Sequence, residues 1–268
     1  MRRSNFPLYT DNYDKVNEVL MLHGFTGSHE SMNELSELLP YNCTAPDLIG
    51  HGRSPSPLEL RPYRMGEMVK QLDGVAETSL VKPFNIVGYS MGARLALSYA
   101  TVRQKSINSL VLIGGSPGIE KEQDRYLRAV EDAKLAEEIE VSGLQQFVSF
   151  WEKKRIFSSQ ENLSIQRKEK IRRIRLSHRT HGLANHLRMA GTGVMESLWS
   201  KLEYLKIPIL LIVGEQDEKF LNIAESMIRK IPYGEFEIIP NAGHAVHYEK
   251  PKETANLISR FLDSQAVR

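Results

Sequence analysis

The residues best placed to do chemistry are those of the pentapeptide Gly88-Tyr89-Ser90-Met91-Gly92. It follows the apolar run 84–87 and precedes the helix-like stretch 93–100, so the pattern predicts a strand, a sharp turn and a helix. The two glycines lack the Cβ atoms that would clash in so tight a turn, which would raise the Ser90 hydroxyl at the end of a sheet. Because small residues also make ordinary strand-to-helix turns, its partners must decide whether Ser90 reacts.

A reactive serine needs an imidazole to accept its proton and a carboxylate to hold that imidazole in the right tautomer. Asp217 follows the apolar run 209–213 and His244 follows the run 236–239, which gives the chain order Ser, Asp, His. Asp217 could instead be a solvated loop acid, in which case Glu215 is the rival for the catalytic carboxylate. An isolated histidine such as His244 often has a structural role. We predict Ser90, Asp217 and His244 as the catalytic residues because the histidine occupies the loop that this order requires.

A negative oxygen on a substrate also needs hydrogen-bond donors. The segment 22–27, Leu-His-Gly-Phe-Thr-Gly, follows the first strong apolar run. We predict that the backbone N–H groups of Phe25 and Met91 form an oxyanion hole. His23 is expected to order this loop and is not nominated as the base, and the glycine-containing segment 47–54 is interpreted as scaffold.

Short apolar runs separated by helical stretches predict the framework that positions these groups; the runs are 19–22, 84–87, 110–113, 209–213 and 236–239. Continuous hydrophobicity is typical of strands covered on both faces, so we predict an α/β fold with a mostly parallel central sheet flanked by helices. Helices are expected at 66–80, 93–103, 224–230 and 253–262. The capping-box spacing of Ser31 and Glu34 predicts a further helix that carries Leu35.

Between residues 117 and 202 the pattern changes to long, charged, amphipathic stretches without a strand signal. We predict one core domain built from residues 1–116 and 203–268, interrupted by a helical lid at 117–202. Such a lid would cover the carboxyl edge of the sheet, where open α/β sheets bind ligands.

Composition excludes several classes of function. Lys and Arg number 35 against 33 Asp and Glu, so no global field draws the protein to nucleic acid or anionic lipid. The single cysteine, Cys43, rules out an internal disulfide and a cysteine-rich metal site, and we interpret it as a small buried strand residue in a reducing cytosol. No apolar run approaches the ~20 residues of a membrane-spanning helix, and residues 4–9 are too polar for a signal-peptide core. We expect a soluble cytoplasmic protein without metal or organic cofactor, stable membrane insertion or nucleic-acid partner, and predict no particular oligomeric state.

In these residues the chain resembles the α/β-hydrolase superfamily over nearly its whole length. The resemblance rests on the His-Gly loop, the Asp-x-x-Gly-His-Gly-x-Ser segment at 47–54, the serine turn, and the acid and histidine loops. It implies shared machinery but not one reaction, because the superfamily includes esterases, peptidases, haloperoxidases, C–C hydrolases and lyases.

A finer resemblance is to the 2-succinyl-6-hydroxy-2,4-cyclohexadiene-1-carboxylate synthases, the menaquinone-pathway lyases built on this fold. It rests on Arg94 in the first turn after the serine and on segments 114–119, 150–151, 175–177, 182–185, 191–193 and 215–220. The resemblance implies a small tricarboxylate substrate that loses pyruvate after proton abstraction. Arginine forks bind carboxylates bidentately, so Arg94, Arg128 and Arg175 are the candidate substrate-binding residues, with Tyr89 and Trp151 beside them.

Other interpretations of these residues stay open. A lid arginine is often a solvated charge, Trp151 could fill the lid core, and Tyr89 could brace the turn. Residues 177–180 read Ser-His-Arg-Thr where relatives commonly show an Asn-rich turn, which weakens the assignment of Arg175. Two rival functions are a serine hydrolase of esters or C–C bonds with Ser90 as nucleophile, and a non-catalytic ligand receptor on the same fold.

Overall fold

The protein was analysed as a computed structural model, which describes residues 6–10 and 17–266. In this part of the chain, six parallel strands form one sheet in the order β2-β1-β3-β4-β5-β6. The strands are β1 (Asn17–Leu22), β2 (Cys43–Thr44), β3 (Leu80–Tyr89), β4 (Ile107–Ile113), β5 (Ile209–Gly214) and β6 (Gly234–Ile239).

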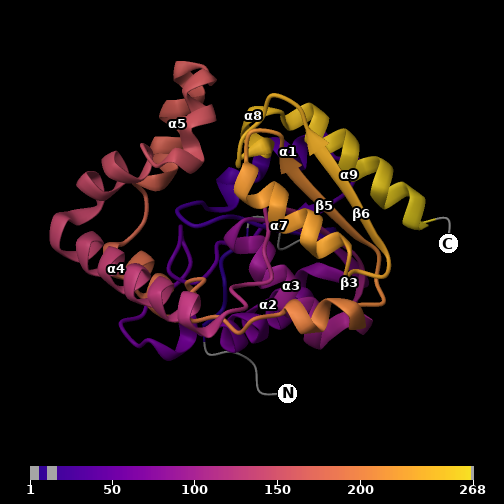
Figure 1. Cartoon of the computed structure of the whole chain (residues 1–268), viewed down its shortest axis with the longest axis horizontal. Helices are drawn as coiled ribbons and strands as arrows, with labels where there is room; N and C mark the ends of the chain where they lie inside the picture. The colour runs from indigo at the N-terminus through magenta and orange to yellow at the C-terminus, as the bar shows by residue number, and fades with distance from the viewer. Residues whose placement is uncertain (1–5, 11–16, 267–268) are drawn as a thin grey trace.

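Helices cover both faces of the sheet (Figure 1). One face packs against α2 (Met65–Ser79), α3 (Met91–Arg103) and α7 (Glu218–Ile228), and the other against α1 (Asn33–Leu38) and α9 (Pro251–Ala266). Along β1, Leu20 and Leu22 join the first apolar cluster while Val19 and Met21 join the second. Because successive side chains of a strand point to opposite faces, a strand buried on both must be apolar throughout. The predicted fold class is confirmed.

The segment between β4 and β5 is helical and lies to one side of the sheet (Figure 1). It contains α4 (Glu122–Trp151), a 3₁₀ stretch (Arg155–Asn162), α5 (Ile165–Arg175) and α6 (Thr180–Ala190). Gly143, at a φ of 77°, interrupts the helical backbone of α4. Helices α4 and α6 share a small apolar cluster that includes Ala136, Phe147, Val148 and Leu183. We call residues 117–202 the lid.

Helix boundaries differ from the expectations in three places. The predicted helix that carries Leu35 is present as α1, but Ser31 does not cap it: Ser31 lies in a 3₁₀ turn (His29–Ser31), where its Oγ accepts the N–H of Ser28, and α1 begins only at Asn33. Helix α7 begins at Glu218 and not at residue 224. Its first turns are more polar than its end, but they carry the partly buried apolar residues Phe220, Leu221 and Ile223, which pack against the core. Helix α9 begins at Pro251, a residue suited to a first helical position.

The remaining elements are short. They are α8 (Val246–Glu249) and the 3₁₀ turns Arg61–Tyr63, Gln104–Ser106 and Trp199–Tyr204. Cys43 lies buried in β2, as expected. No helix in the described ranges is long and apolar enough to cross a membrane. Residues 4 and 5, part of the stretch judged for a signal peptide, lie outside those ranges.

The sheet order determines where a ligand can enter. The chain passes from β1 to β2 on one side of the sheet, and from β3 to β4 on the other side. The loops that follow β1 and β3 therefore diverge at the carboxyl edge, which is where open α/β sheets form a binding crevice. The loops after β5 and β6, which carry Asp217 and His244, end at the same edge.

Candidate active site

Ser90 occupies the sharp turn between β3 and α3. Its φ of 50° lies in the left-handed region that a serine rarely adopts. Its N–H donates to Ile113 O on β4 at 2.8 Å, which holds this strained residue against the sheet. A Cβ at Gly92 would lie 2.1 Å from Leu22 O, and one at Gly88 would lie 2.7 Å from Gly92 O. Both glycines are therefore required by close backbone contacts.

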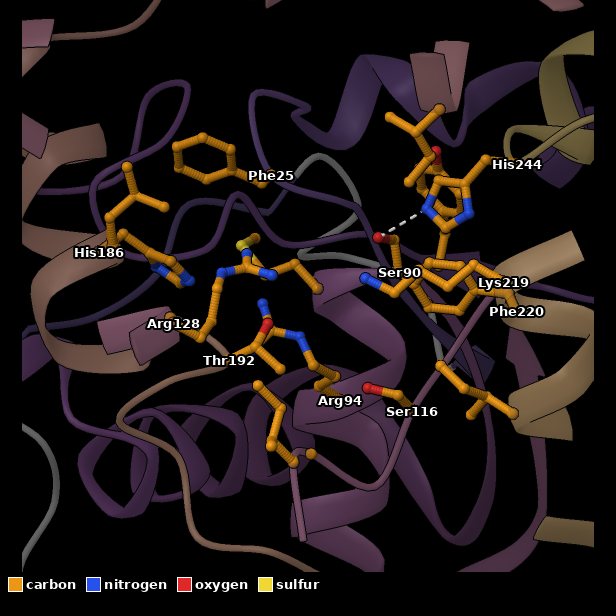
Figure 2. Close-up of a pocket in the computed structure, with 18 of the residues that line it drawn as sticks. Phe25, Ser90, Arg94, Ser116, Arg128, His186, Thr192, Lys219, Phe220 and His244 are labelled. Atoms are coloured by element: carbon orange, nitrogen blue, oxygen red, sulfur yellow. Dashed lines mark hydrogen bonds between the residues drawn. The ribbon is translucent and has the colours of Figure 1, made fainter. Parts of the chain in front are cut away.

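The three residues predicted as catalytic are hydrogen-bonded in series. His244 Nε2 lies 2.9 Å from Ser90 Oγ (dashed in Figure 2), and His244 Nδ1 lies 2.6 Å from Asp217 Oδ2. His244 and Asp217 are both buried. A carboxylate only accepts, so Nδ1 carries the imidazole proton and Nε2 is free to accept the proton of the Ser90 hydroxyl. The arrangement suits proton transfer away from Ser90.

Two other carboxylates brace the histidine loop. Glu215, the rival acid, accepts the N–H of Asn241 at 2.8 Å. Glu249, on α8, accepts the N–H of Gly243 at 2.6 Å and that of Ala245 at 3.2 Å, on either side of His244. Glu249 was missed because it belongs to no recognised motif and becomes a neighbour of the loop only when the chain turns into α8.

The loop after β1 is held by His23, as expected. Leu48 N–H donates to His23 Nε2 at 2.9 Å, so the ring proton is on Nδ1, which donates to Gly24 O at 2.8 Å. The next N–H, that of Phe25, makes no hydrogen bond within the described ranges. Met91 is the first residue of α3, where the N–H has no intrahelical acceptor. The two amides predicted as oxyanion donors thus belong to residues that line one cavity with Ser90.

A cavity of roughly 200 Å³ lies between Ser90 and the lid (Figure 2). Besides Ser90, its walls carry aromatic, aliphatic and cationic side chains and the hydroxyls of a serine and a threonine, and no acidic side chain is among its described lining residues. The aromatic residues are Phe25, Tyr89, Trp151, Phe157 and Phe220; the cations are Arg94, Arg128 and Lys219; the hydroxyls are Ser116 and Thr192. Such a cavity favours an anionic ligand.

Arg94 lies one turn into α3 with its guanidinium in this cavity (Figure 2). It donates to Ala190 O at 2.8 Å and pairs with no carboxylate of the described residues. Burial, and secondly the neighbouring charge of Arg128, lowers the pKa of Arg94 to about 10. Arg94 is therefore a largely desolvated cation without a countercharge of its own.

Arg128, on α4, enters the cavity from the lid. Its Nε donates to Asp132 Oδ1, one turn later, at 2.8 Å. Asp132 also accepts a longer bond from Gly193 N–H, at 3.4 Å. A Cβ at Gly193 would lie 2.2 Å from Ala129 N, so the 191–193 loop requires glycine to pack on α4. Asp132 orients the arginine while leaving its two terminal nitrogens available.

Two titratable residues of the cavity, Lys219 and His186, were missed by sequence reasoning. Lys219 follows Asp217 by two residues, so the end of β5 brings it to the same edge, and burial, then the charge of Arg128, lowers its pKa. His186, on α6, is 1 % exposed with neither ring nitrogen hydrogen-bonded, and burial lowers its pKa to about 3. The position of Lys219 beside the predicted acid was a usable signal, whereas His186 offered none.

Tyr89 and Trp151 line the cavity, as predicted, but Arg175 does not. Arg175 is buried in a smaller adjoining cavity, where it donates to Gln160 Oε1 at 3.2 Å and lies over the ring of Phe157. Arg175 is the last residue of α5, and its guanidinium reaches Gln160 and Phe157 of the lid in a cavity that core residues such as Gly24 and Tyr248 also line. Phe157 and Tyr89 line both cavities.

Comparisons with known proteins agree with this geometry. Residues 17–251 match the family model described as the alpha/beta hydrolase fold. A Bacillus subtilis protein named "Putative 2-succinyl-6-hydroxy-2,4-cyclohexadiene-1-carboxylate synthase" is 40% identical over 92% of this chain and 90% of its own length. The structure of MenH from S. aureus superposes with a TM-score of 0.88 at 34% identity, covering 97% of this chain and 98% of that one. A Thermogutta terrifontis esterase, at 23% identity and a TM-score of 0.79, shares the fold.

Proposed function

Because this chain belongs to the α/β-hydrolase fold family and, within it, to the 2-succinyl-6-hydroxy-2,4-cyclohexadiene-1-carboxylate synthases, we propose that it is a carbon–oxygen lyase of menaquinone biosynthesis. It converts 2-succinyl-5-enolpyruvyl-6-hydroxy-3-cyclohexene-1-carboxylate to 2-succinyl-6-hydroxy-2,4-cyclohexadiene-1-carboxylate and pyruvate. The reaction takes place in the cytoplasm and uses only groups that the chain supplies.

The observation that carries this proposal is the pairing of an activated serine with a cationic cavity. Three cations face the space above Ser90, and no described lining residue is acidic. The substrate has three carboxylates, which arginine binds as a planar fork and lysine as a point charge. A pocket for a neutral acyl group would not need a desolvated cation such as Arg94, since burying an unpaired charge is costly.

The serine acts as a base in this reaction. His244 takes the hydroxyl proton, and Ser90 Oγ removes the ring proton at C2, next to the succinyl ketone. The C–H electron pair moves onto the ketone oxygen as an enolate, which the N–H groups of Phe25 and Met91 stabilise. As the pair returns it forms C2=C3, the C3=C4 pair becomes C4=C5, and the C5–O bond breaks. The enolpyruvate that leaves takes up a proton and becomes pyruvate.

A coupled assay tests this function by following pyruvate released from the enolpyruvyl substrate with lactate dehydrogenase and NADH. Wild type should release pyruvate, and Arg128→Ala should lower kcat/KM by roughly tenfold or more, the worth of one charge-assisted hydrogen bond. Arg173→Ala is the matched control, because that lid arginine is exposed and pairs with Glu30 away from the cavity. Absence of pyruvate with wild type, or an equal loss in both variants, would reject the proposal.

A further inference from the structure

His178 lies in the connection between α5 and α6. Its side chain is buried and crosses from the lid to two loops of the core. Gly52 N–H donates to His178 Nδ1 at 3.0 Å, and His178 Nε2 lies 2.8 Å from Thr26 O. The residue is thus a direct connection between the lid and the loop that carries Phe25.

These two contacts determine the protonation of the ring. A backbone N–H can only donate, so Nδ1 is the acceptor and the proton lies on Nε2, which donates to Thr26 O. Burial lowers the pKa of His178, and Asp47 is the charged group that opposes this. The ring of His51 packs edge-on against it at 5.3 Å. The neutral ring with its proton on Nε2 satisfies both neighbours, whereas a charged ring would turn a second N–H toward Gly52.

The acceptor of this bond belongs to a strained residue. Thr26 has a φ of 64°, a conformation that β-branched residues rarely adopt and that persists only where surrounding contacts hold it. It directly follows Phe25 in a turn closed by the bond from Gly27 N–H to Gly24 O at 3.0 Å. His23, from the core, donates to Gly24 O, the carbonyl of the peptide that contains the Phe25 N–H, and His178, from the lid, donates to Thr26 O, the carbonyl of the residue after Phe25.

We propose that His178 is a positioning residue of the lid, which holds the strained turn at Thr26 and so keeps the Phe25 N–H aimed at the negative oxygen formed in the reaction. The lid then serves the chemistry as well as covering the cavity, because the oxyanion donor is correctly placed only when α6 is docked. This inference rests on the proposed function for the identity of that oxygen. The geometry of the turn is independent of the substrate.

Two apolar variants and one control separate positioning from general support of the lid. His178→Phe and the smaller His178→Leu remove both hydrogen bonds, while His178→Asn keeps one donor and one acceptor. His181→Phe is the matched control, because His181 is also a lid histidine and donates to Ser56 O, a core carbonyl outside the Phe25 loop, at 2.7 Å. Using two apolar variants keeps the test valid if one of them fails to fold.

Pyruvate release is the first measurement. Loss of a whole oxyanion donor costs about 10²–10³ in kcat, so a misplaced donor should lower kcat by roughly tenfold in the apolar variants, with little change in KM. His178→Asn should recover much of this loss, and His181→Phe should retain wild-type kcat. Unchanged kcat in the apolar variants, or an equal fall in His181→Phe, would overturn the inference.

Two further measurements do not depend on the natural substrate. The rate at which a fluorophosphonate labels Ser90 should fall in the apolar variants, since the phosphonyl oxygen uses the same donors. Backbone amide exchange in residues 23–28 should accelerate in those variants and stay unchanged in His181→Phe. If wild type releases no pyruvate but these two effects appear, the proposed function fails and the positioning role stands. If wild type is active but labelling and exchange are unchanged, only the positioning role fails.

Discussion

Replacing Arg94 by Met should weaken catalysis and, at the same time, leave the protein as stable or more stable. The guanidinium is held in the cavity by a hydrogen bond to Ala190 O and a long one to Met195 Sδ, with no carboxylate partner among the described residues. Methionine is similarly long and flexible, so it fills most of the same space without a charge. A carboxylate of the substrate would supply the countercharge that Arg94 lacks in the folded chain alone.

The size of both effects follows from the structure. The pKa of Arg94 falls from 12.5 to about 10 on folding, so below pH 10 the charged side chain destabilises the folded state. Allowing for water in the open cavity, this cost is on the order of 1–3 kcal/mol. Loss of the bond to Ala190 O offsets about 1 kcal/mol of the gain. Arg94→Met should therefore change the free energy of unfolding by about 0 to +2 kcal/mol.

Catalysis should change in the opposite direction. A charge-assisted hydrogen bond contributes about 1.5–3 kcal/mol, which corresponds to a loss of roughly tenfold to a hundredfold in kcat/KM. Urea denaturation and the coupled pyruvate assay measure the two effects on one preparation. Arg94→Lys is the control, since it keeps the charge and should recover activity only in part, because it lacks the planar fork. A variant that loses more than about 2 kcal/mol of stability while keeping wild-type kcat/KM would refute this reasoning.

Three other outcomes are expected. Ser90→Ala should reduce turnover by orders of magnitude with an unchanged circular dichroism spectrum, and near-normal turnover would remove Ser90 from the mechanism. Gly92→Ala should unfold or severely destabilise the protein, because its Cβ would meet the β1 backbone, whereas Gly74→Ala, in open space on α2, should stabilise it by about 0.5–1 kcal/mol in urea denaturation. Lowering the pH from 7.5 to 5.5 should reduce the free energy of unfolding by on the order of 1 kcal/mol for each of His23, His186 and His247, and a flat profile would contradict the burial of these rings.

The sign of this pH effect follows from the direction of the pKa shifts. Burial lowers the pKa of His23 to about 4 and those of His186 and His247 to about 3. The unfolded chain binds protons with a pKa of about 6.5, so between pH 6.5 and 4 the unfolded state takes up more protons than the folded one. Stability is therefore greatest above pH 6.5 and declines as the pH falls through this window.

The sheet and the serine turn could be predicted from sequence because each depends on local chemistry. Continuous apolar runs have no stable place except between two helical layers, and Gly88 and Gly92 indicated a turn in which backbone atoms come too close for a Cβ. The order of Ser90, Asp217 and His244 identified three hydrogen-bonded residues because parallel strands end at one edge.

The parts that could not be predicted depend on packing between distant segments. Arg175 and Arg128 look alike in the sequence, but only the direction of each lid helix decides which guanidinium reaches the cavity. Glu249 braces the histidine loop through backbone N–H groups, which any carboxylate at that place could do. His178 looked like a departure from a familiar turn, and its role appears only when the lid meets the Phe25 loop.

The most direct test of the account is the mass of the ring product formed by wild type from the enolpyruvyl substrate. A lyase removes pyruvate without adding water, so the ring product should be the diene, lighter by one water than the alcohol that hydrolysis at the same carbon would give. Ser90→Ala should form neither product at a comparable rate. The account predicts the diene with one equivalent of pyruvate, and the hydrated ring product, or efficient cleavage of neutral esters without pyruvate release, would contradict it.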